Sequence, residues 1–277
     1  MTDKYAVIGN PIAHSKSPQI HKMFRDQTGE DISYEAILAP LDGFAAKVME
    51  LREKGYKGCN VTVPFKFEAF DIALHLTPRV LAAKAVNTLS FKNNEIYGDN
   101  TDGVGLVRDI ESNIDIPLQG KRVLLMGAGG AAWGIQLPLL MTNIQILVAV
   151  NRTKEKADEM LGHGKKYYPH FFDVPISAET YDQLDGKQFD VVINATSSGL
   201  SGEMPPLPPG IFAPGALAYD MMYGRETPFM KFAREHGASV VSDGLGMLVE
   251  QAAESFFIWR GVRPETAPVI EALRKFQ

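Results

Sequence analysis

The chain has little cysteine, no long apolar run and no block of like charge. Its one cysteine, Cys59, excludes an intramolecular disulfide, and its apolar-leaning surroundings suit a buried small side chain better than a nucleophile. No apolar run reaches the roughly 18 residues that span a bilayer, and none near the start has the length of a signal peptide. We therefore expect a cytoplasmic protein without a membrane segment.

Patterns typical of nucleic-acid or metal binding are also missing. The formal net charge of −5 is spread along the chain, which leaves no electrostatic footprint for nucleic acid or an anionic membrane. Neither His14 nor His21 stands in a metal-ligand spacing, and no other cluster of histidine, cysteine and aspartate suggests a metal site. The expected partner is a small molecule, and no metal is implied.

The sequence has the composition of a globular protein, with 45% hydrophobic and 22% charged residues. At about 150 residues per domain, two domains are expected for a chain of 277 residues. Alternation of β-rich runs with helical periodicity predicts an α/β fold.

The first half is predicted to contain strands at 5–8, 33–38, 58–63 and 85–91, and helices at 18–27, 41–54 and 66–76. A turn-rich stretch at 97–101 and a helix at 103–112 follow. The second half then starts a strand at Lys121, with further strands at 145–150, 169–172, 191–194, 217–220 and 239–242 and terminal helices at 248–260 and after Pro264. Such a series after a glycine-rich turn predicts a doubly wound parallel sheet.

A glycine-rich turn follows the strand that starts at Lys121. Gly127 and Gly129 would let the backbone turn tightly and approach a pyrophosphate, and the small Ala132 would let the next helix pack near the strand. Free amides at that helix start would face an anion. A glycine-rich turn also arises by chance, so how strongly it indicates a dinucleotide site depends on the sequence downstream.

The end of the next strand indicates which dinucleotide binds. An acidic residue about 20 positions after the glycines would bind the ribose of NAD, but Asn151 stands there and is followed by Arg152, Thr153 and Lys154. The guanidinium of Arg152 suits phosphate oxygens, which favours NADP(H). The alternative is that Arg152 and Lys154 only begin a solvated helix face.

Two residues before the glycine turn are candidate acid/base groups. Lys66 follows a strand and a proline at a helix start, where the helix dipole disfavours an ammonium. Asp102 ends the loop Gly98-Asp-Asn-Thr-Asp-Gly103 and is predicted to cap the next helix. Each has a plain alternative, a solvated lysine and a capping aspartate. Together, near one substrate, they could pass a proton while a hydride moves on the cofactor.

Hydroxyl and amide side chains gather in loops of the same segment. They include Ser15, Ser17, Thr62, Asn87 and Thr88. Such groups suit a small polyhydroxylated acid, which needs many fixed donors and acceptors. Ser17 before Pro18 is equally typical of a helix N-cap.

Eight stretches, taken together, closely resemble the shikimate dehydrogenase family. They are Asn10-Pro-Ile-Ala-His-Ser-Lys-Ser-Pro18, Asn60-Val-Thr-Val-Pro-Phe-Lys66, Ala85-Val-Asn-Thr-Leu89, Gly98-Asp-Asn-Thr-Asp-Gly103, Gly127-Ala-Gly-Gly-Ala131, Asn151-Arg-Thr153, Asn194-Ala-Thr-Ser-Ser198 and Asp243-Gly-Leu-Gly-Met247. They span nearly the whole chain in the family's order. The resemblance implies reversible, NADPH-dependent reduction of 3-dehydroshikimate to shikimate, on the route to chorismate and aromatic amino acids.

The resemblance also implies roles for single residues. Lys66 would be the acid/base residue and Asp102 its partner. Shikimate would be bound by Ser15, Ser17, Thr62, Asn87, Tyr223 and Gln251. NADP(H) would be bound by Gly127, Ala128, Gly129, Gly130, Ala131, Asn151, Arg152, Thr153 and Lys154, with Met221 and Gly244 lining the nicotinamide.

The implied architecture has two α/β domains. Residues 1–103 would form the substrate domain, completed by C-terminal helices at 246–277, and residues 104–245 a Rossmann-like NADP domain. A monomer or a homodimer is expected.

The sequence departs from the family at three places. Trp133 stands where members often carry a polar or basic residue, which puts a phosphate contact from that side chain in doubt. Pro78 replaces a frequent acidic residue after Thr77, and Gly224-Arg225 occupies a variable stretch beside Tyr223.

Two rival functions would each leave a different mark in the sequence. A quinate/shikimate dehydrogenase that uses NAD as well as NADP would carry an acidic residue near the ribose, which Asn151 argues against. A catalytically silent metabolite-binding paralogue would be expected to lack Lys66 or Asp102, and both are present.

Overall fold

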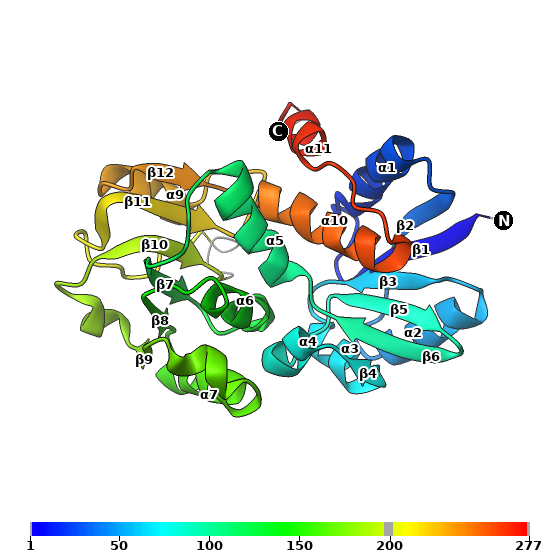
Figure 1. Ribbon diagram of the computed structural model, residues 1–277, viewed down its shortest axis with the longest axis horizontal. Coiled ribbons are helices and arrows are strands. Elements are labelled where there is room, and N and C mark those ends of the chain that lie inside the picture. The colour runs from blue at the N-terminus through cyan, green and yellow to red at the C-terminus, as the bar shows by residue number, and fades with distance from the viewer. Residues whose placement is uncertain (1, 197–201, 276–277) are drawn as a thin grey trace.

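The computed structural model describes residues 2–196 and 202–275, which form two six-stranded sheets side by side with α10 and α5 crossing between them (Figure 1). The predicted α/β fold with a doubly wound parallel sheet is confirmed.

The first sheet is mixed and has the order β2-β1-β3-β5-β6-β4. β1 is parallel to β2 and β3, whereas β5 is antiparallel to β3 and β6. Its strands are β1 (Asp3–Gly9), β2 (Ile32–Leu38), β3 (Gly58–Val61), β4 (His75–Leu76), β5 (Thr88–Lys92) and β6 (Glu95–Asp99), and its helices are α1 (Ser17–Thr28), α2 (Phe44–Glu53), α3 (Lys66–Ile72) and α4 (Pro78–Ala83).

The second sheet is wholly parallel, with the order β12-β11-β10-β7-β8-β9. Its central strands are buried on both faces because helices cover both sides, so they read as continuous apolar runs such as Val-Leu-Leu-Met in β7. The strands are β7 (Arg122–Met126), β8 (Ile146–Val150), β9 (Ile176–Glu179), β10 (Phe189–Asn194), β11 (Phe212–Asp220) and β12 (Val240–Ser242), with α6 (Gly130–Leu140), α7 (Lys154–Tyr167) and α9 (Pro228–Glu235).

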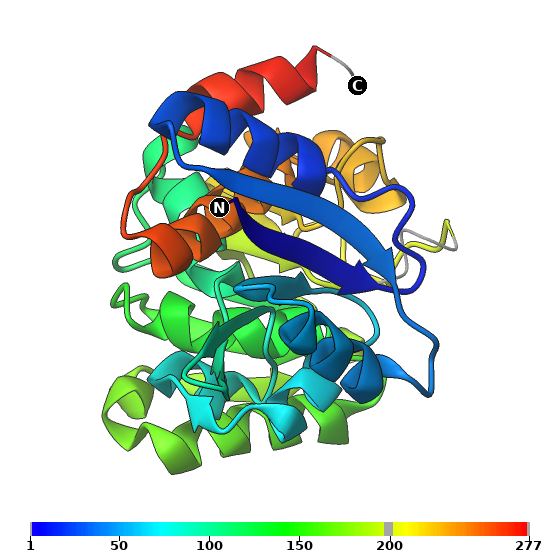
Figure 2. The ribbon, with the colours of Figure 1, turned by 90° about the vertical axis from the view of Figure 1, so that its right-hand side faces the viewer.

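Two helical segments connect the sheets. α5 (Asp102–Arg108), extended by a π-helical turn (Asp109–Asn113), leads from the first sheet to the second, and α10 (Leu245–Arg260) returns. The inner face of α10 shares a core with α1 and with α11 (Ala267–Arg274), and α11 lies beside α1 at one end of the molecule (Figure 2). The C-terminal helices therefore pack on the N-terminal half.

Several local predictions were wrong. Residues 169–172, predicted as a strand, form part of a 3₁₀ turn (Pro169–Asp173), because proline has no amide hydrogen for a strand ladder. The strand of that region is β9, a few residues later. The stretch 97–101 was predicted as turn, yet Glu95–Asp99 is strand β6, paired with β5.

Two helices begin one residue earlier than their predicted caps imply, and the cysteine lies in the core. Ser17 and Asp102 were considered as N-caps, but Lys16 and Thr101 hold those positions, and each predicted cap is the first residue of its helix. Cys59 is fully buried, and burial raises the pKa of its thiol, which confirms the interpretation as a small buried side chain.

Candidate functional site

A cavity of about 760 Å³ opens between the two sheets. Both halves of the chain line it, the first through the carboxyl ends of β1 and β3, the second through the carboxyl ends of its parallel strands. The predicted site residues in its walls are Ser15, Ser17, Thr62, Lys66, Asn87, Asp102, Gly127, Ala128, Gly129, Gly130, Ala131, Asn151, Arg152, Met221, Tyr223, Gly244 and Gln251. Ligand crevices of α/β sheets form at this edge.

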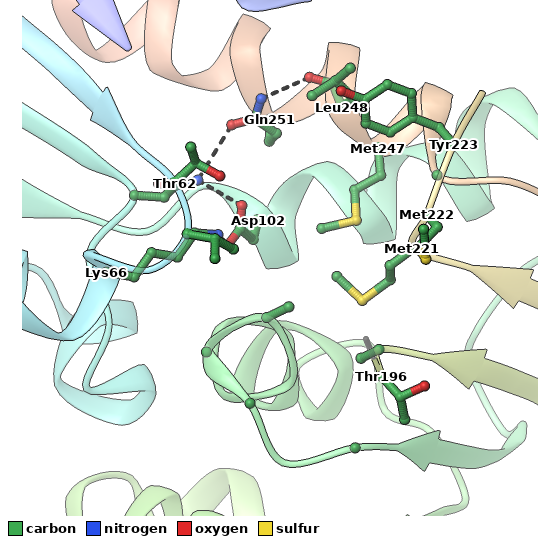
Figure 3. Close-up of a pocket in the computed structure, with 18 of the residues that line it drawn as sticks. Thr62, Lys66, Asp102, Thr196, Met221, Met222, Tyr223, Met247, Leu248 and Gln251 are labelled. Carbon is green, nitrogen blue, oxygen red and sulfur yellow. Dashed lines mark hydrogen bonds and ion pairs between the residues drawn. The ribbon is translucent and has the colours of Figure 1, made fainter. Parts of the chain in front are cut away.

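An ion pair of Lys66 and Asp102 lies at one end of the cavity (Figure 3). Lys66 begins α3 and Asp102 begins α5, so two helix starts bring together residues 36 positions apart. The side chains are 16% and 8% exposed, so little water screens the pair. A cation and a carboxylate are thus fixed where a substrate could meet them.

The carboxamide of Asn87 holds Asp102 in place. Its Nδ2 donates to Asp102 Oδ1 at 2.8 Å and, more weakly, to Gln251 Oε1 at 3.3 Å. Its Oδ1 accepts from the Thr101 backbone amide at 2.9 Å, which fixes the orientation of the amide group. Gln251 donates its own Nε2 to the Leu248 carbonyl at 2.8 Å, so α10 contributes directly to this end of the cavity.

Buried hydroxyl and amide groups lie behind Asn87. Thr88 Oγ1 donates to Asn87 Oδ1 at 2.8 Å and lies 2.8 Å from Ser255 Oγ on α10. Asn60 donates to Ser255 Oγ at 2.9 Å and accepts from the Tyr34 hydroxyl at 2.7 Å. A hydrogen-bonded network of this kind keeps buried polar groups satisfied and restricts their geometry.

Hydroxyl groups surround the rest of this end. Ser15 and Ser17 follow β1, and the Ser17 backbone amide donates to Ser15 Oγ at 3.3 Å. Thr62 follows β3, and Tyr223 follows β11 from the opposite side of the cavity. Burial raises the pKa of Tyr223, so its hydroxyl stays neutral and able to donate a hydrogen bond.

The glycine-rich turn forms another wall of the cavity. Gly127 has φ +106°, a conformation that side chains rarely adopt, and a Cβ there would lie 3.1 Å from the Ala195 carbonyl oxygen. Gly129 is the N-cap of α6, and the first amides of a helix have no partner within it. The turn therefore offers backbone donors to an anion at the cavity wall, as a pyrophosphate requires.

Asn151 and Arg152 line the cavity beside this turn. The predicted residues Thr153 and Lys154 do not line it. Asn151 donates to the Thr153 carbonyl at 2.8 Å, and Lys154 forms an ion pair with Asp158 on the surface of α7 at 2.6 Å. Of the two cationic residues Arg152 and Lys154, Arg152 is the one that lines the cavity.

A methionine-rich wall faces the ion pair. Met221, Met222 and Met247 lie across the cavity from Lys66 and Asp102, and the Gly244 amide donates to the Met222 carbonyl at 2.9 Å (Figure 3). Thioether side chains provide apolar, adaptable contact for a flat ring.

Sequence reasoning missed Tyr181 in the lining. It follows β9, and because β9 was predicted at 169–172, the residue after it could not be assigned to the carboxyl edge. Burial raises the pKa of Tyr181 to about 12, an effect that Arg152 opposes. Thr196 and Met247 were also missed as lining residues, although the motifs that contain them were noticed. Ser197 and Ser198, at the end of one such motif, lie outside the described residues.

Within residues 2–196 and 202–275, no group of three or more histidine, cysteine, aspartate or glutamate residues is arranged to hold a metal ion. No helix in the described part of the chain is both long and apolar enough to cross a membrane. The cavity thus combines the Lys66–Asp102 pair, which can carry a proton, with fixed polar groups at the same end. Its other walls are the glycine-rich turn, which can bind an anion, and the apolar methionine side chains. That combination suits hydride transfer between a dinucleotide and a small hydroxylated compound.

In sequence, the chain is similar to shikimate dehydrogenases. Residues 7–89 match the family described as the shikimate dehydrogenase substrate binding domain, and residues 244–274 match the shikimate 5'-dehydrogenase C-terminal domain. The shikimate dehydrogenase (NADP(+)) of Methylobacillus flagellatus is 60% identical over 272 residues, which cover 98% of this chain and 99% of that protein.

Solved structures agree in fold over the full length. An Ael1 enzyme from Pseudomonas putida has a TM-score of 0.90 and 46% identity, with 98% of each chain covered. Shikimate 5-dehydrogenase of Thermus thermophilus, solved in complex with NADP(H) and shikimate, has a TM-score of 0.85 and 28% identity, with 99% of each chain covered.

Proposed function

The chain belongs to the shikimate dehydrogenase family, and we propose that it catalyses the reversible reduction of 3-dehydroshikimate to shikimate with NADPH. The observation that carries the proposal is that the Lys66–Asp102 pair and the glycine-rich turn form walls of the same cavity. This activity would place the enzyme on the route to chorismate and the aromatic amino acids.

The nucleotide, when bound, supplies the hydride, and the chain supplies the proton. In the reductive direction Lys66 gives a proton to the carbonyl oxygen as it becomes a hydroxyl, and in the oxidative direction it takes the proton back. Asp102 holds the ammonium group toward the cavity, and Asn87 holds Asp102. The proton therefore passes at a fixed position, and screening by water is small because the pair is largely buried.

The substrate is held by the polar groups of the same end. We assign the acid and hydroxyl groups of shikimate to Ser15, Ser17, Thr62, Asn87, Tyr223 and Gln251. The assignment is supported by their common cavity and by the buried network that fixes Asn87.

The cofactor is held by the second half of the chain. We assign the pyrophosphate to the turn Gly127–Ala131 and the nicotinamide to Met221 and Gly244. We assign the 2′-phosphate to Asn151 and Arg152, with Thr153 and Lys154 beside them. Arg152 supports NADP(H), since a guanidinium attracts the extra phosphate and Asn151 stands at the position where an acidic residue would repel it.

The two sheets correspond to two proposed domains. We assign residues 1–103 with 246–277 to the substrate domain and residues 104–245 to the NADP domain, which the packing of α10 and α11 on α1 supports. We propose that the enzyme acts in the cytoplasm as a monomer or a homodimer.

The test is the oxidation of shikimate followed by the absorbance of the reduced cofactor. We expect kcat/KM with NADP⁺ to exceed that with NAD⁺ by about tenfold or more, the size of a charge-assisted hydrogen bond, and quinate to react poorly. Comparable rates with quinate and with NAD⁺ would identify a quinate/shikimate dehydrogenase instead. Shikimate binding without turnover would identify a silent paralogue.

A further inference from the structure

Trp133 is hydrogen-bonded to the glycine-rich turn that lines the cavity. It lies on α6, three residues after the helix begins, and is only 6% exposed. Its indole Nε1 donates a hydrogen bond of 3.2 Å to the carbonyl oxygen of Ala128, inside the glycine-rich turn. Ala128 lines the cavity whereas Trp133 does not, so the indole supports the turn from outside the cavity.

Neighbouring rings fix the direction of this indole. Phe67, the residue after Lys66, meets it edge-on, with ring centroids 6.3 Å apart and planes at 90°. His163 of α7 packs on it at 5.2 Å and is itself hydrogen-bonded to the Leu81 carbonyl of α4 at 2.8 Å. Because rings from two other helices hold the indole, its N–H stays directed at the Ala128 carbonyl.

The peptide bond between Ala128 and Gly129 links the hydrogen bond of Trp133 to the cavity. A trans peptide is planar, so the Ala128 carbonyl and the Gly129 amide hydrogen point in opposite directions. An indole that holds the carbonyl therefore turns the Gly129 amide away from Trp133. Gly129 lines the cavity and caps α6, where free amides favour an anion.

We propose that Trp133 is a positioning residue for the cofactor: its indole N–H holds the Ala128 carbonyl and so orients the Gly129 amide toward the pyrophosphate. The role rests on the proposed function, because it needs a dinucleotide at the turn. It also accounts for the large aromatic side chain at this place, which acts on the turn itself and has no need to reach a phosphate.

The test compares two tryptophan-to-phenylalanine variants. Trp133→Phe keeps a ring but loses the donor to Ala128, whereas Trp259→Phe is a matched control, since the Trp259 indole donates to the Leu89 carbonyl at 3.1 Å, far from the turn. By calorimetry we expect Trp133→Phe to raise the Kd for NADP⁺ about five- to tenfold, as for one lost hydrogen bond, with the Kd for shikimate unchanged. Trp259→Phe should leave the Kd for NADP⁺ within about twofold of wild type.

A spectroscopic measurement keeps the test independent of how well Trp133→Phe folds. The chain has two tryptophans, so Trp259→Phe leaves a single indole N–H resonance, that of Trp133. We expect this resonance to shift when NADP⁺ is added and to stay in place when shikimate alone is added. A resonance unmoved by saturating NADP⁺, or a wild-type Kd in Trp133→Phe, would overturn the role of Trp133. Wild-type oxidation of shikimate, measured first, tests the proposed function separately.

Discussion

His21 is a buried imidazole in the core that α1 shares with α10. Its ring stacks on Tyr34 with centroids 3.9 Å apart and lies 6.1 Å from the ring of Phe256. Burial lowers the pKa of His21 to about 3, because the charged form would lose its hydration. The side chain is therefore neutral in the native state over most of the acidic range.

This burial predicts a pH-dependent stability. In the unfolded chain His21 takes up a proton below its ordinary pKa of 6.5, whereas the native state takes it up only near 3. The free energy of unfolding should therefore fall as the pH drops from 6.5 toward 3, by up to about 1.4 kcal/mol per pH unit from this residue. Denaturant unfolding of His21→Phe between pH 6 and pH 4 should show a shallower dependence than wild type. As a control, His170→Gln, at an exposed position, should keep the wild-type slope. An unchanged slope in His21→Phe would contradict the account.

At the scale of single residues, the sequence predicted those site residues that a local chemical pattern or a family motif marks. Lys66 could be selected because the helix dipole disfavours a cation at a helix start, and Asp102 because it lies in a stretch that resembles the family. The network behind them could not, because the sequence marks Thr88 only as one of several hydroxyl groups and gives no sign that Ser255 lies 2.8 Å from it. Tyr181 was missed because its strand was assigned too early in the chain.

Among the elements, the crossing of α5 and α10 determines where Gln251 lies. A Cβ added to Gly105 would come 2.7 Å from the Gln251 backbone nitrogen and 2.8 Å from its Cβ. The two helices are thus in backbone contact at this point, and only glycine permits the approach. Gln251 then reaches the polar end of the cavity next to Asn87.

Substitution of Gly105 should disturb substrate binding. Gly105→Ala must push α10 outward at Gln251, so we expect the KM for shikimate to rise about tenfold, since small misplacements in a site are costly. Overpacking should also lower the free energy of unfolding by about 1–3 kcal/mol. Steady-state kinetics and denaturant unfolding measure the two effects.

The matched control is Gly162→Ala on α7, where an added Cβ would meet nothing within 4 Å. It should leave the KM unchanged and stabilise the protein by about 0.5–1 kcal/mol, since alanine favours helix more than glycine. A wild-type KM for shikimate in Gly105→Ala would show that α10 does not position Gln251 for the substrate.

Elements with a strong local pattern were predicted, and those set by distant contacts were not. β7 and α6 carry a continuous apolar run and a glycine turn, and both were placed within a few residues. The short β4 and α4 were missed, because two and six residues give too little periodicity to recognise. Helices were predicted at 248–260 and after Pro264, where α10 and α11 lie, but local pattern gave no sign of their packing on α1; the family likeness implied only a return to the N-terminal domain.

At the scale of the whole molecule, the function depends on bringing two sheet edges together. Residues after β1 and β3 of the first sheet face residues after β7, β8, β10 and β11 of the second across one cavity. The sequence predicted two α/β units and a cofactor turn. It could not by itself show that their carboxyl edges face each other, because that geometry is set by α5 and α10, which join residues more than a hundred positions apart.

The central claim is that Lys66 carries the proton in shikimate oxidation, and the turnover of Lys66→Ala tests it most directly. Lys22→Ala is the matched control, because Lys22 pairs with Asp26 on the surface at 2.7 Å with 63% of its side chain exposed. We expect kcat for shikimate with NADP⁺ to fall at least about a hundredfold in Lys66→Ala, with the Kd for shikimate far less affected and Lys22→Ala like wild type. Turnover of Lys66→Ala comparable to wild type would contradict the account.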